Sequence, residues 1–366
     1  MRYYIIFLVI ICFYLFYSLK YDYNRNRQQF LLYYRFDENV SKNKQSIDII
    51  EPFKTLFKTH RINEARSYRH ADILFFKLLT DYITIFPHIM KIKKPVYIYS
   101  LKSIDILANK AILHKILSID DVKQKKYTPI TYILDNEQDL SDFIDDYDNS
   151  KLYILKKNVQ RQKGCTITNN IEYIKQSLHN EYVVGQELLQ DPFLVNGHKI
   201  NLRQYVLVII KEKCKFKLYN NGFMYYTPKK FKKNSLDKDR HITTGYIDRE
   251  IYEMNPLTVQ EFYKLLGTKK ANILKRNLIN LFNYISFSYN PHIVKYDANH
   301  HLNFMILGCD VAVNKNLECK IMEINKGPDL TYKDERDKSV KYHLVKDTLY
   351  QIGLINNPNK NFIDLN

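Results

Sequence analysis

The sequence predicts an α/β (α+β) fold, and three observations support this prediction. Short apolar runs rich in β-branched and aromatic residues alternate with stretches whose apolar residues recur at helical spacing. Turn residues separate several neighbouring apolar runs, as expected of β-hairpins. Nine glycines and ten prolines are few for 366 residues, so long disordered tracts are not expected and the chain can bury a large core.

The charge of the chain favours an acidic partner. Its 56 Lys+Arg residues against 39 Asp+Glu give a net charge of +17, which suits nucleic acid, phospholipid, a nucleotide or an acidic protein tail. There is no zinc-finger spacing and no evident basic repeat with interleaved aromatic residues, so no nucleic acid is expected as a partner. The five cysteines are scattered without a C-x-x-C pair, which indicates reduced thiols in a cytosol-like compartment.

Residues 3–19 are apolar or aromatic and carry no charge. As a helix they would be about 25 Å long, enough for one transmembrane anchor across a thin bilayer. Basic residues follow the segment, which places the large C-terminal part on the cytoplasmic side of the membrane. The alternatives are a cleaved signal peptide or a buried core helix. Residues 21–45 are polar and mixed, and are expected to be a linker.

The next elements form an N-terminal α/β domain over residues 46–125. Residues 71–79 and 95–101 are typical of strands or short helices, and residues 105–117 of an amphipathic helix. Residues 127–134 alternate as a strand, and the acidic residues 137–148 favour a solvated helix. None of these patterns identifies a chemistry.

Residues 151–156 predict a short strand that ends in Lys156. A polar loop containing Gly164 follows, and residues 165–168 predict a second strand. A lysine at the end of a strand that faces a glycine loop is one way to hold phosphate. A solvated surface lysine is the alternative.

Two strand-like runs between residues 182 and 210 flank Asn196-Gly197, a strong hairpin signal. On the second run, Lys199, Asn201 and Arg203 alternate and therefore share one face. Fixed cationic donors on one face suit a polyphosphate. The alternative is a solvated sheet face.

Three further elements follow. Residues 216–227 predict another hairpin around residues 220–222, and residues 266–289 an amphipathic core helix. The charged segment that begins near residue 333 predicts a helix ending at Gly353.

The strongest chemical signal lies between residues 304 and 330. Two apolar runs, 304–313 and 319–324, flank the turn residues 314–316 and predict a hairpin that brings Asp310 opposite Glu323. Asn325 lies two residues beyond Glu323, on the same face of the strand. Two buried carboxylates and an amide oxygen suit Mg²⁺ completed by water and phosphate. In the alternative, Glu323 pairs with a lysine and Asp310 faces solvent.

The order of these motifs resembles the tubulin–tyrosine ligase family. The motifs are a strand lysine, a Gln-Glu pair, N-G-x-K-x-N-L-R, H-x-T, and G-x-D followed by M-E-I-N. The resemblance covers about residues 60–354. It implies an ATP-grasp fold and an enzyme that joins amino acids to tubulin tails. It also implies a central ATP-grasp subdomain at residues 126–195, a C-terminal one with the metal site at 196–354, and a tail at 355–366.

The resemblance implies roles for particular residues. ATP would contact Lys156, Lys163, Gly164, the hinge residues Gln186 and Glu187, Lys199 and Asn201. Arg203 would meet the γ-phosphate or an acyl-phosphate, His241 and Thr243 would lie near the acceptor, and Asp310, Glu323 and Asn325 would hold Mg²⁺. The implied partners are a free amino acid and an acidic, tubulin-like protein tail.

The chain also departs from the family pattern. The family's aspartate before L-R is replaced by Asn201, and its proline after the strand lysine by Lys157. Its second phosphate arginine is replaced by Tyr225, and the asparagine of its H-x-T-N motif by Thr244. The glycine-rich loop keeps only Gly164. These departures leave two alternatives to an amino-acid ligase: a membrane adaptor that binds nucleotide or tubulin without efficient transfer, and an ATP-grasp ligase for another peptide or metabolite.

Overall fold

A computed structural model describes residues 31–36, 50–76, 82–157, 164–245, 247–293, 300–356 and 361–365. The predicted anchor at residues 3–19 and most of the predicted linker lie outside these ranges. Among the residues that are described, no helix is both long enough and apolar enough to span a bilayer.

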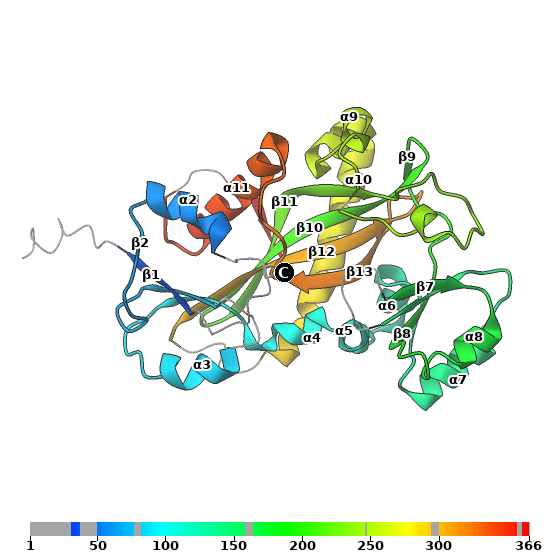
Figure 1. Cartoon of the computed structure of the whole chain (residues 1–366), viewed down its shortest axis with the longest axis horizontal. Helices are drawn as coiled ribbons and strands as arrows, with labels where there is room; N and C mark the ends of the chain where they lie inside the picture. The colour runs from blue at the N-terminus through cyan, green and yellow to red at the C-terminus, as the bar shows by residue number, and fades with distance from the viewer. Residues whose placement is uncertain are drawn as a thin grey trace, which may run out of the picture.

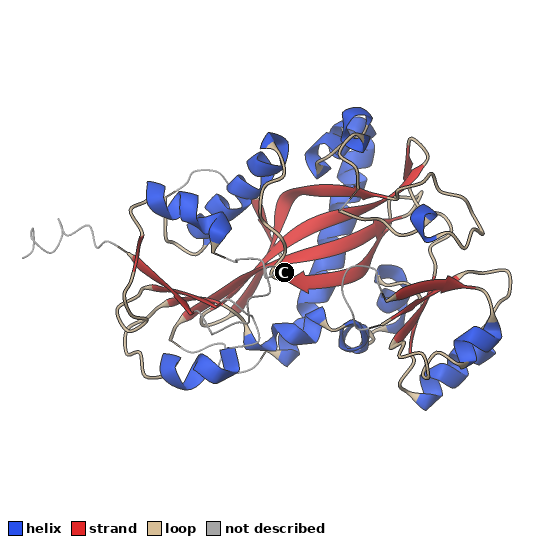
Figure 2. Cartoon of the chain, viewed as in Figure 1, coloured by secondary structure: helices blue, strands red, loops and turns tan. Residues whose placement is uncertain are grey.

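Two β-sheets organise the chain (Figures 1 and 2). The larger contains ten strands: β1 (Leu32–Phe36), β2 (Asn63–Glu64), β3 (Ile73–Phe76), β4 (Tyr97–Tyr99), β9 (Leu194–Val195), β10 (His198–Ile210), β11 (Cys214–Tyr226), β12 (Leu302–Val313), β13 (Cys319–Lys326) and β14 (Phe362–Asp364). Its order is β14-β11-β10-β12-β4-β3-β1-β2, with β13 paired to β12 and β9 to β10. Strands from both ends of the chain therefore share one sheet.

The smaller sheet has the order β5-β8-β6-β7. Its strands are β5 (Thr131–Ile133), β6 (Tyr153–Lys156), β7 (Cys165–Thr168) and β8 (Val184–Glu187). The helices α7 (Glu137–Asp145) and α8 (Ile171–Lys175) lie beside it at one end of the molecule (Figure 1). All four strands come from the segment in which the sequence predicted the central subdomain.

Helices cover both parts of the structure. They are α2 (Glu51–Thr59), α3 (Tyr82–Ile89), α4 (Asp105–Ala108), α5 (Lys110–Leu117), α6 (Asp121–Tyr127), α9 (Ile251–Met254), α10 (Val259–Tyr289) and α11 (Glu335–Gln351), with short 3₁₀ turns at Lys102–Ile104, Lys238–Arg240 and Asn290–His292. Helix α10 runs along one face of the large sheet (Figure 1) and buries Leu274, Leu278, Leu281 and Ile285 against it. The two predicted C-terminal helices are confirmed, and Gly353 follows α11 with φ of 80°.

The predicted hairpin around residues 220–222 is wrong, because β11 passes through these residues without reversing. The chain turns earlier, between Ile210 and Cys214. Gly222 lies opposite Gln204, at an irregularity where the pairing register shifts. A methyl group on Gly222 would lie 2.2 Å from the Arg203 carbonyl oxygen, so glycine permits a close approach of two strands here.

The predicted linker also contains a strand. Residues 32–36 form β1, which pairs in parallel with β3 and places Tyr33 in the core at 9% exposure. Its partner lies about forty residues further along the chain, for example Tyr33 beside Ile73. Local composition carries no information about such a distant pairing.

Candidate active site

The hairpin predicted from the apolar runs 304–313 and 319–324 is confirmed. Strand β12 pairs with β13 so that Asp310 lies opposite Glu323 and Gly308 opposite Asn325. The turn between them is held by the Asn314 side chain, whose Oδ1 accepts from the backbone N–H groups of residues 316 and 318. The two carboxylates and the amide therefore come from adjacent strands of a rigid sheet.

Asp310 also contacts a cation on its other neighbouring strand. Arg203 of β10 lies opposite Asp310, with Nε 2.7 Å from Oδ1 and Nη2 3.2 Å from Oδ2. Burial raises the pKa of Asp310 to about 6; the Arg203 charge opposes this rise and the Glu323 charge adds to it. The alternative in which Asp310 faces solvent is wrong. The other part of that alternative, in which Glu323 pairs with a lysine, is confirmed in part, because Lys110 Nζ lies 3.7 Å from Glu323 Oε1.

The donor set fits Mg²⁺. Two neighbouring carboxylates repel each other at low exposure, which a bound cation relieves. Among the described residues there is no cluster of three His, Cys, Asp or Glu side chains suited to a metal, so Asn325 and non-protein ligands would complete the shell. A partial oxygen shell of this kind, open toward phosphate and water, is what Mg²⁺ takes in nucleotide sites.

Two buried lysines face this hairpin. Lys156 ends β6 with 8% exposure, and Lys199 lies on β10 with 4% exposure. Burial, together with the Lys156 charge, lowers the pKa of Lys199 to about 8. Burial likewise lowers the pKa of Lys156, whose ammonium donates to Gln186 Oε1. No acceptor for the Lys199 ammonium is found among the described residues, so the pair is suited to receive an anion.

A small pocket lies between the two sheets, next to Lys156. Lys110, Lys156 and Gln186 line it together with apolar side chains of β8 and β13, including Val184 and Ile321. Gln186 is also fixed by its Nε2, which donates to Thr131 Oγ1 at 2.8 Å. The pocket has a polar edge and apolar walls, which is the kind of lining that a nucleotide base takes, and its volume of about 20 Å³ would have to widen to admit one.

Lys110 is a site residue that the sequence analysis missed. The predicted helix over residues 105–117 is broken at Asn109, which is extended and caps α5 by accepting from the N–H groups of residues 111 and 112. Lys110 therefore begins a helix instead of lying within one, and it points at Glu323. The asparagine before an apolar run is an N-cap signal that could have revealed this break.

The other predicted ATP contacts are distributed differently. Glu187 follows Gln186 on β8, so its side chain points to the opposite face and pairs with Lys151 at 2.9 Å. Lys163 lies outside the described residues, and the Gly164 carbonyl accepts from the Lys157 backbone at 2.7 Å. Asn201 lies on β10 between Tyr225 and Ala312, and its buried Oδ1 has no partner among the described residues.

His241 lies near Lys199. It is 2% exposed and packs against Phe231 with the ring centroids 5.3 Å apart. Burial and the Lys199 charge lower the pKa of His241, so its ring is neutral near pH 7. Thr243 follows at partial burial, and Thr244 bonds back to Tyr226 through its N–H at 3.1 Å.

Tyr225 occupies the place of the expected second arginine. The Arg203 guanidinium lies over its ring at 5.1 Å from the centroid. Two cations that could have replaced the arginine are held elsewhere: Lys229 pairs with Asp237 at 3.0 Å, and Arg240 donates to the Lys230 carbonyl at 2.9 Å. The described residues thus place one arginine, not two, beside the carboxylate hairpin.

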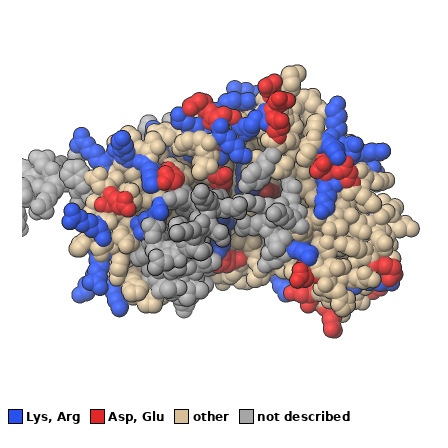
Figure 3. All heavy atoms as spheres, viewed as in Figure 1, with Lys and Arg blue, Asp and Glu red and all other residues tan. Residues whose placement is uncertain are grey.

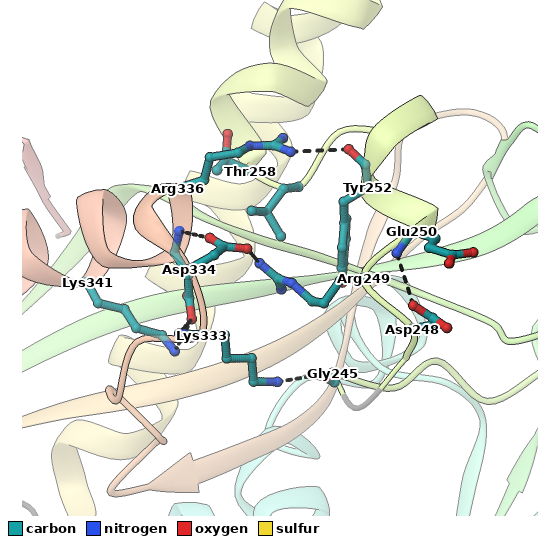
Figure 4. A network of polar contacts seen from close by, with 12 residues as sticks. Gly245, Asp248, Arg249, Glu250, Tyr252, Thr258, Lys333, Asp334, Arg336 and Lys341 are labelled. Atoms are coloured by element: carbon teal, nitrogen blue, oxygen red, sulfur yellow. Dashed lines mark hydrogen bonds and ion pairs between the residues drawn. The ribbon is translucent and has the colours of Figure 1, made fainter.

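The segment after His241 is fastened to the start of α11 (Figure 4). Lys333 donates to the Gly245 carbonyl at 2.7 Å, Arg249 pairs with Asp334, and Arg336 donates to the Tyr252 carbonyl at 3.2 Å.

On the face seen in Figure 3, basic residues lie along the upper and left edges among acidic ones, without one continuous basic field. That view gives no support for a single large basic surface.

The two sheets, the buried lysines and the carboxylate hairpin define an ATP-grasp-like fold with a site suited to a nucleotide. A sequence profile described as "Tubulin-tyrosine ligase family" matches residues 93–361, so the chain belongs to this family.

Similar curated proteins carry the name of one activity. The chain is 26% identical to "Probable tubulin polyglutamylase TTLL9" of Rattus norvegicus over 52% of this chain and 43% of that protein. It is 27% identical to "Tubulin polyglutamylase TTLL6" of Homo sapiens over 56% of this chain and 25% of that one. For "Probable alpha-tubulin polyglutamylase Ttll1" of Tetrahymena thermophila the identity is 26%, over 55% and 50%. The chain thus aligns with half or less of the length of each of these relatives.

Proposed function

We propose that the protein is an ATP- and Mg²⁺-dependent ligase that joins an amino acid to the acidic tail of a protein such as tubulin. The observation that carries the proposal is the charge arrangement of the cleft. Within the described part of the chain, Lys156 and Lys199 are buried with no carboxylate at ion-pair distance, and Asp310 and Glu323 adjoin each other nearby. Mg-ATP would give the lysines an anion and would add a cation to a carboxylate pair whose charge Arg203 and Lys110 offset only in part. The names of the relatives make glutamate the first amino acid to test.

The side chains have distinct tasks in this proposal. Gln186 and the apolar pocket hold the base, and Lys156 and Lys199 bind phosphate oxygens. Asp310, Glu323 and Asn325 would hold Mg²⁺, which neutralises phosphate charge when bound. Arg203, presented by the same sheet, stabilises charge on the terminal phosphate.

The proposed reaction has two steps. A carboxylate oxygen of the acceptor attacks the γ-phosphorus of ATP, the bond to the bridging oxygen breaks, and ADP leaves with that electron pair. The amine of the incoming amino acid then attacks the acyl carbon, inorganic phosphate leaves, and the nitrogen loses a proton. The protein's contribution is positioning, charge neutralisation and exclusion of water. Neutral His241 adds no further positive charge beside Lys199.

The test is ADP release by the full chain with Mg-ATP, tubulin, and glutamate, tyrosine or glycine singly. We expect release that requires tubulin and one amino acid and that is lost in Glu323→Gln. A Lys58→Gln variant is the control, because this exposed lysine lies on α2. ATP hydrolysis that ignores both tubulin and amino acid would contradict the proposal.

A nucleotide-binding adaptor is the second candidate, and Tyr225 and Thr244 favour it because each replaces a polar residue of the family pattern. Tight ATP binding that depends on Glu323, without turnover on any acceptor, would support this candidate. A ligase for another peptide or metabolite would instead release ADP with that acceptor and not with tubulin.

We propose in addition that residues 3–19 anchor the chain in a membrane with the ligase domain on the cytoplasmic side. The uncharged apolar run and the basic residues after it support this. Deleting residues 3–19 should move the protein from the carbonate-resistant membrane fraction to the supernatant. A full-length chain that is already found in the supernatant would contradict the anchor.

A further inference from the structure

Arg203 has two different partners in the cleft. Its guanidinium edge faces the Asp310 carboxylate, and its face lies over the Tyr225 ring at 5.1 Å. A methyl group on Gly308 would lie 2.6 Å from Nη1, so the neighbouring strand leaves the guanidinium little room to move on that side. The side chain of Arg203 is 15% exposed.

These two partners respond differently to a metal. Asp310 belongs to the proposed Mg²⁺ site, so a bound cation competes with Arg203 for its oxygens. The Tyr225 ring offers an uncharged face that has no affinity for Mg²⁺ in this setting. Its contact with Arg203 therefore persists when the contact with Asp310 weakens.

The Tyr225 ring is itself held in place. A methyl group on Gly245 would lie 2.9 Å from the ring carbon Cζ and 3.1 Å from the hydroxyl oxygen. Gly245 is in turn fixed by Lys333, which donates to its carbonyl at 2.7 Å (Figure 4). On the strand side, Tyr225 lies opposite Asn201. The ring is thus supported both by its own sheet and by the segment after His241.

We propose that Tyr225 is a positioning residue that holds Arg203 against the terminal phosphate of ATP once Asp310 has turned to the metal. The inference rests on the proposed function and deepens it, because it assigns to an aromatic ring the support of the arginine. It predicts that Tyr225 affects binding of the γ-phosphate and leaves the rest of the nucleotide unaffected. A ring that merely fills space would change ATP and ADP binding alike.

The experiment measures the affinities of Mg-ATP and Mg-ADP for the full chain by calorimetry. In Tyr225→Leu, ATP affinity should fall by about 3- to 30-fold, the range that one cation–π contact supplies, while ADP affinity changes less than about twofold. Tyr225→Phe keeps the ring and should retain the wild-type ratio of Mg-ATP affinity to Mg-ADP affinity. Tyr263→Leu is the matched control, since Tyr263 is buried and its ring lies 4.6 Å from the Lys275 ammonium, across the kink of α10 at Gly267.

Gly245→Ala gives a second approach if Tyr225→Leu does not fold. Its methyl group should push the ring away from its position, lowering the ATP-to-ADP ratio in the same direction. Equal losses for both nucleotides, or an unchanged ratio in Tyr225→Leu, would overturn the inference while leaving the ligase proposal intact. A wild-type chain that binds neither nucleotide would overturn both.

Discussion

Lys199 should make the protein less stable than it would be with an uncharged side chain. Its pKa falls from 10.5 to about 8, mainly through burial, and this difference corresponds to about 3 kcal/mol against the charged form in the folded state. Because the folded pKa lies below the unfolded one, the penalty is full below pH 8. It disappears as the pH rises from about 8 toward 10.5.

The variant Lys199→Met keeps the apolar stem of the side chain and removes the charge. Without nucleotide at pH 7, the free energy of unfolding should rise by about 1–3 kcal/mol, since part of the penalty is relieved by local relaxation. The increase should shrink between pH 8 and pH 10. With Mg-ATP the order should reverse, because the wild type gains stability by binding and the variant loses a phosphate contact.

Urea unfolding of the full chain at pH 7 and pH 10, with and without Mg-ATP, measures these changes. Lys232→Met is the matched control, because Lys232 is exposed and its charge is already solvated. Other groups also titrate in this range, so the difference between wild type and variant isolates Lys199. A variant that is less stable than the wild type at pH 7 without nucleotide would show that the buried Lys199 charge does not destabilise the folded protein.

Three further predictions concern the same structure. Asp310→Asn should lower Mg²⁺-dependent ATP affinity by at least about tenfold in titration calorimetry, because it removes a charged oxygen ligand; unchanged Mg²⁺ dependence would contradict the metal assignment. Lys341→Met should lower the free energy of unfolding by about 3–5 kcal/mol, since it removes the cation 3.1 Å from the buried Asp337 carboxylate and leaves it the Lys333 backbone N–H at 2.8 Å. Denaturant titration measures this, and a neutral effect would mean that Asp337 is compensated otherwise. Gly222→Ala should destabilise by about 1–3 kcal/mol through the clash with the Arg203 carbonyl, with a lowered melting temperature as readout; an unchanged melting temperature would show that the bulge relaxes at little cost.

The parts of the site that the sequence predicted are those governed by local periodicity. Counting outward from the turn at residues 314–316 predicted Asp310 opposite Glu323. The structure has this pairing, but through an irregularity between Asp310 and Val311 that shifts by one residue the register set at the turn. Alternation along β10 placed Lys199 and Arg203 on one face. Alternation applied with equal care would also have separated Gln186 from Glu187, which point to opposite faces of β8.

The features that the sequence did not reveal depend on pairing over long distances. Residues 220–222 have the composition of a turn, yet β11 continues through them. Its residues 219–221 form an irregularity opposite the single residue Tyr205 of β10. The contact of Lys110 with Glu323 joins α5 to β13 across more than two hundred residues. The ring of Tyr225 under Arg203 is likewise visible only in three dimensions, since an aromatic residue in a strand is by itself unremarkable.

The electrostatic repulsion within the ligand-free site indicates the order in which its ligands bind. The Lys156 charge repels that of Lys199, and the Glu323 charge repels that of Asp310, although both carboxylates also attract Lys156. Arg203 offsets the second repulsion by pairing with Asp310, but that pairing occupies the group proposed to face the terminal phosphate. Mg-ATP relieves both repulsions at once and, in the proposed arrangement, frees Arg203. An acidic acceptor arriving first would meet a cleft whose arginine is already neutralised. Nucleotide should therefore bind before the acceptor, and the affinity for an acidic tail should rise when Mg-ATP is present.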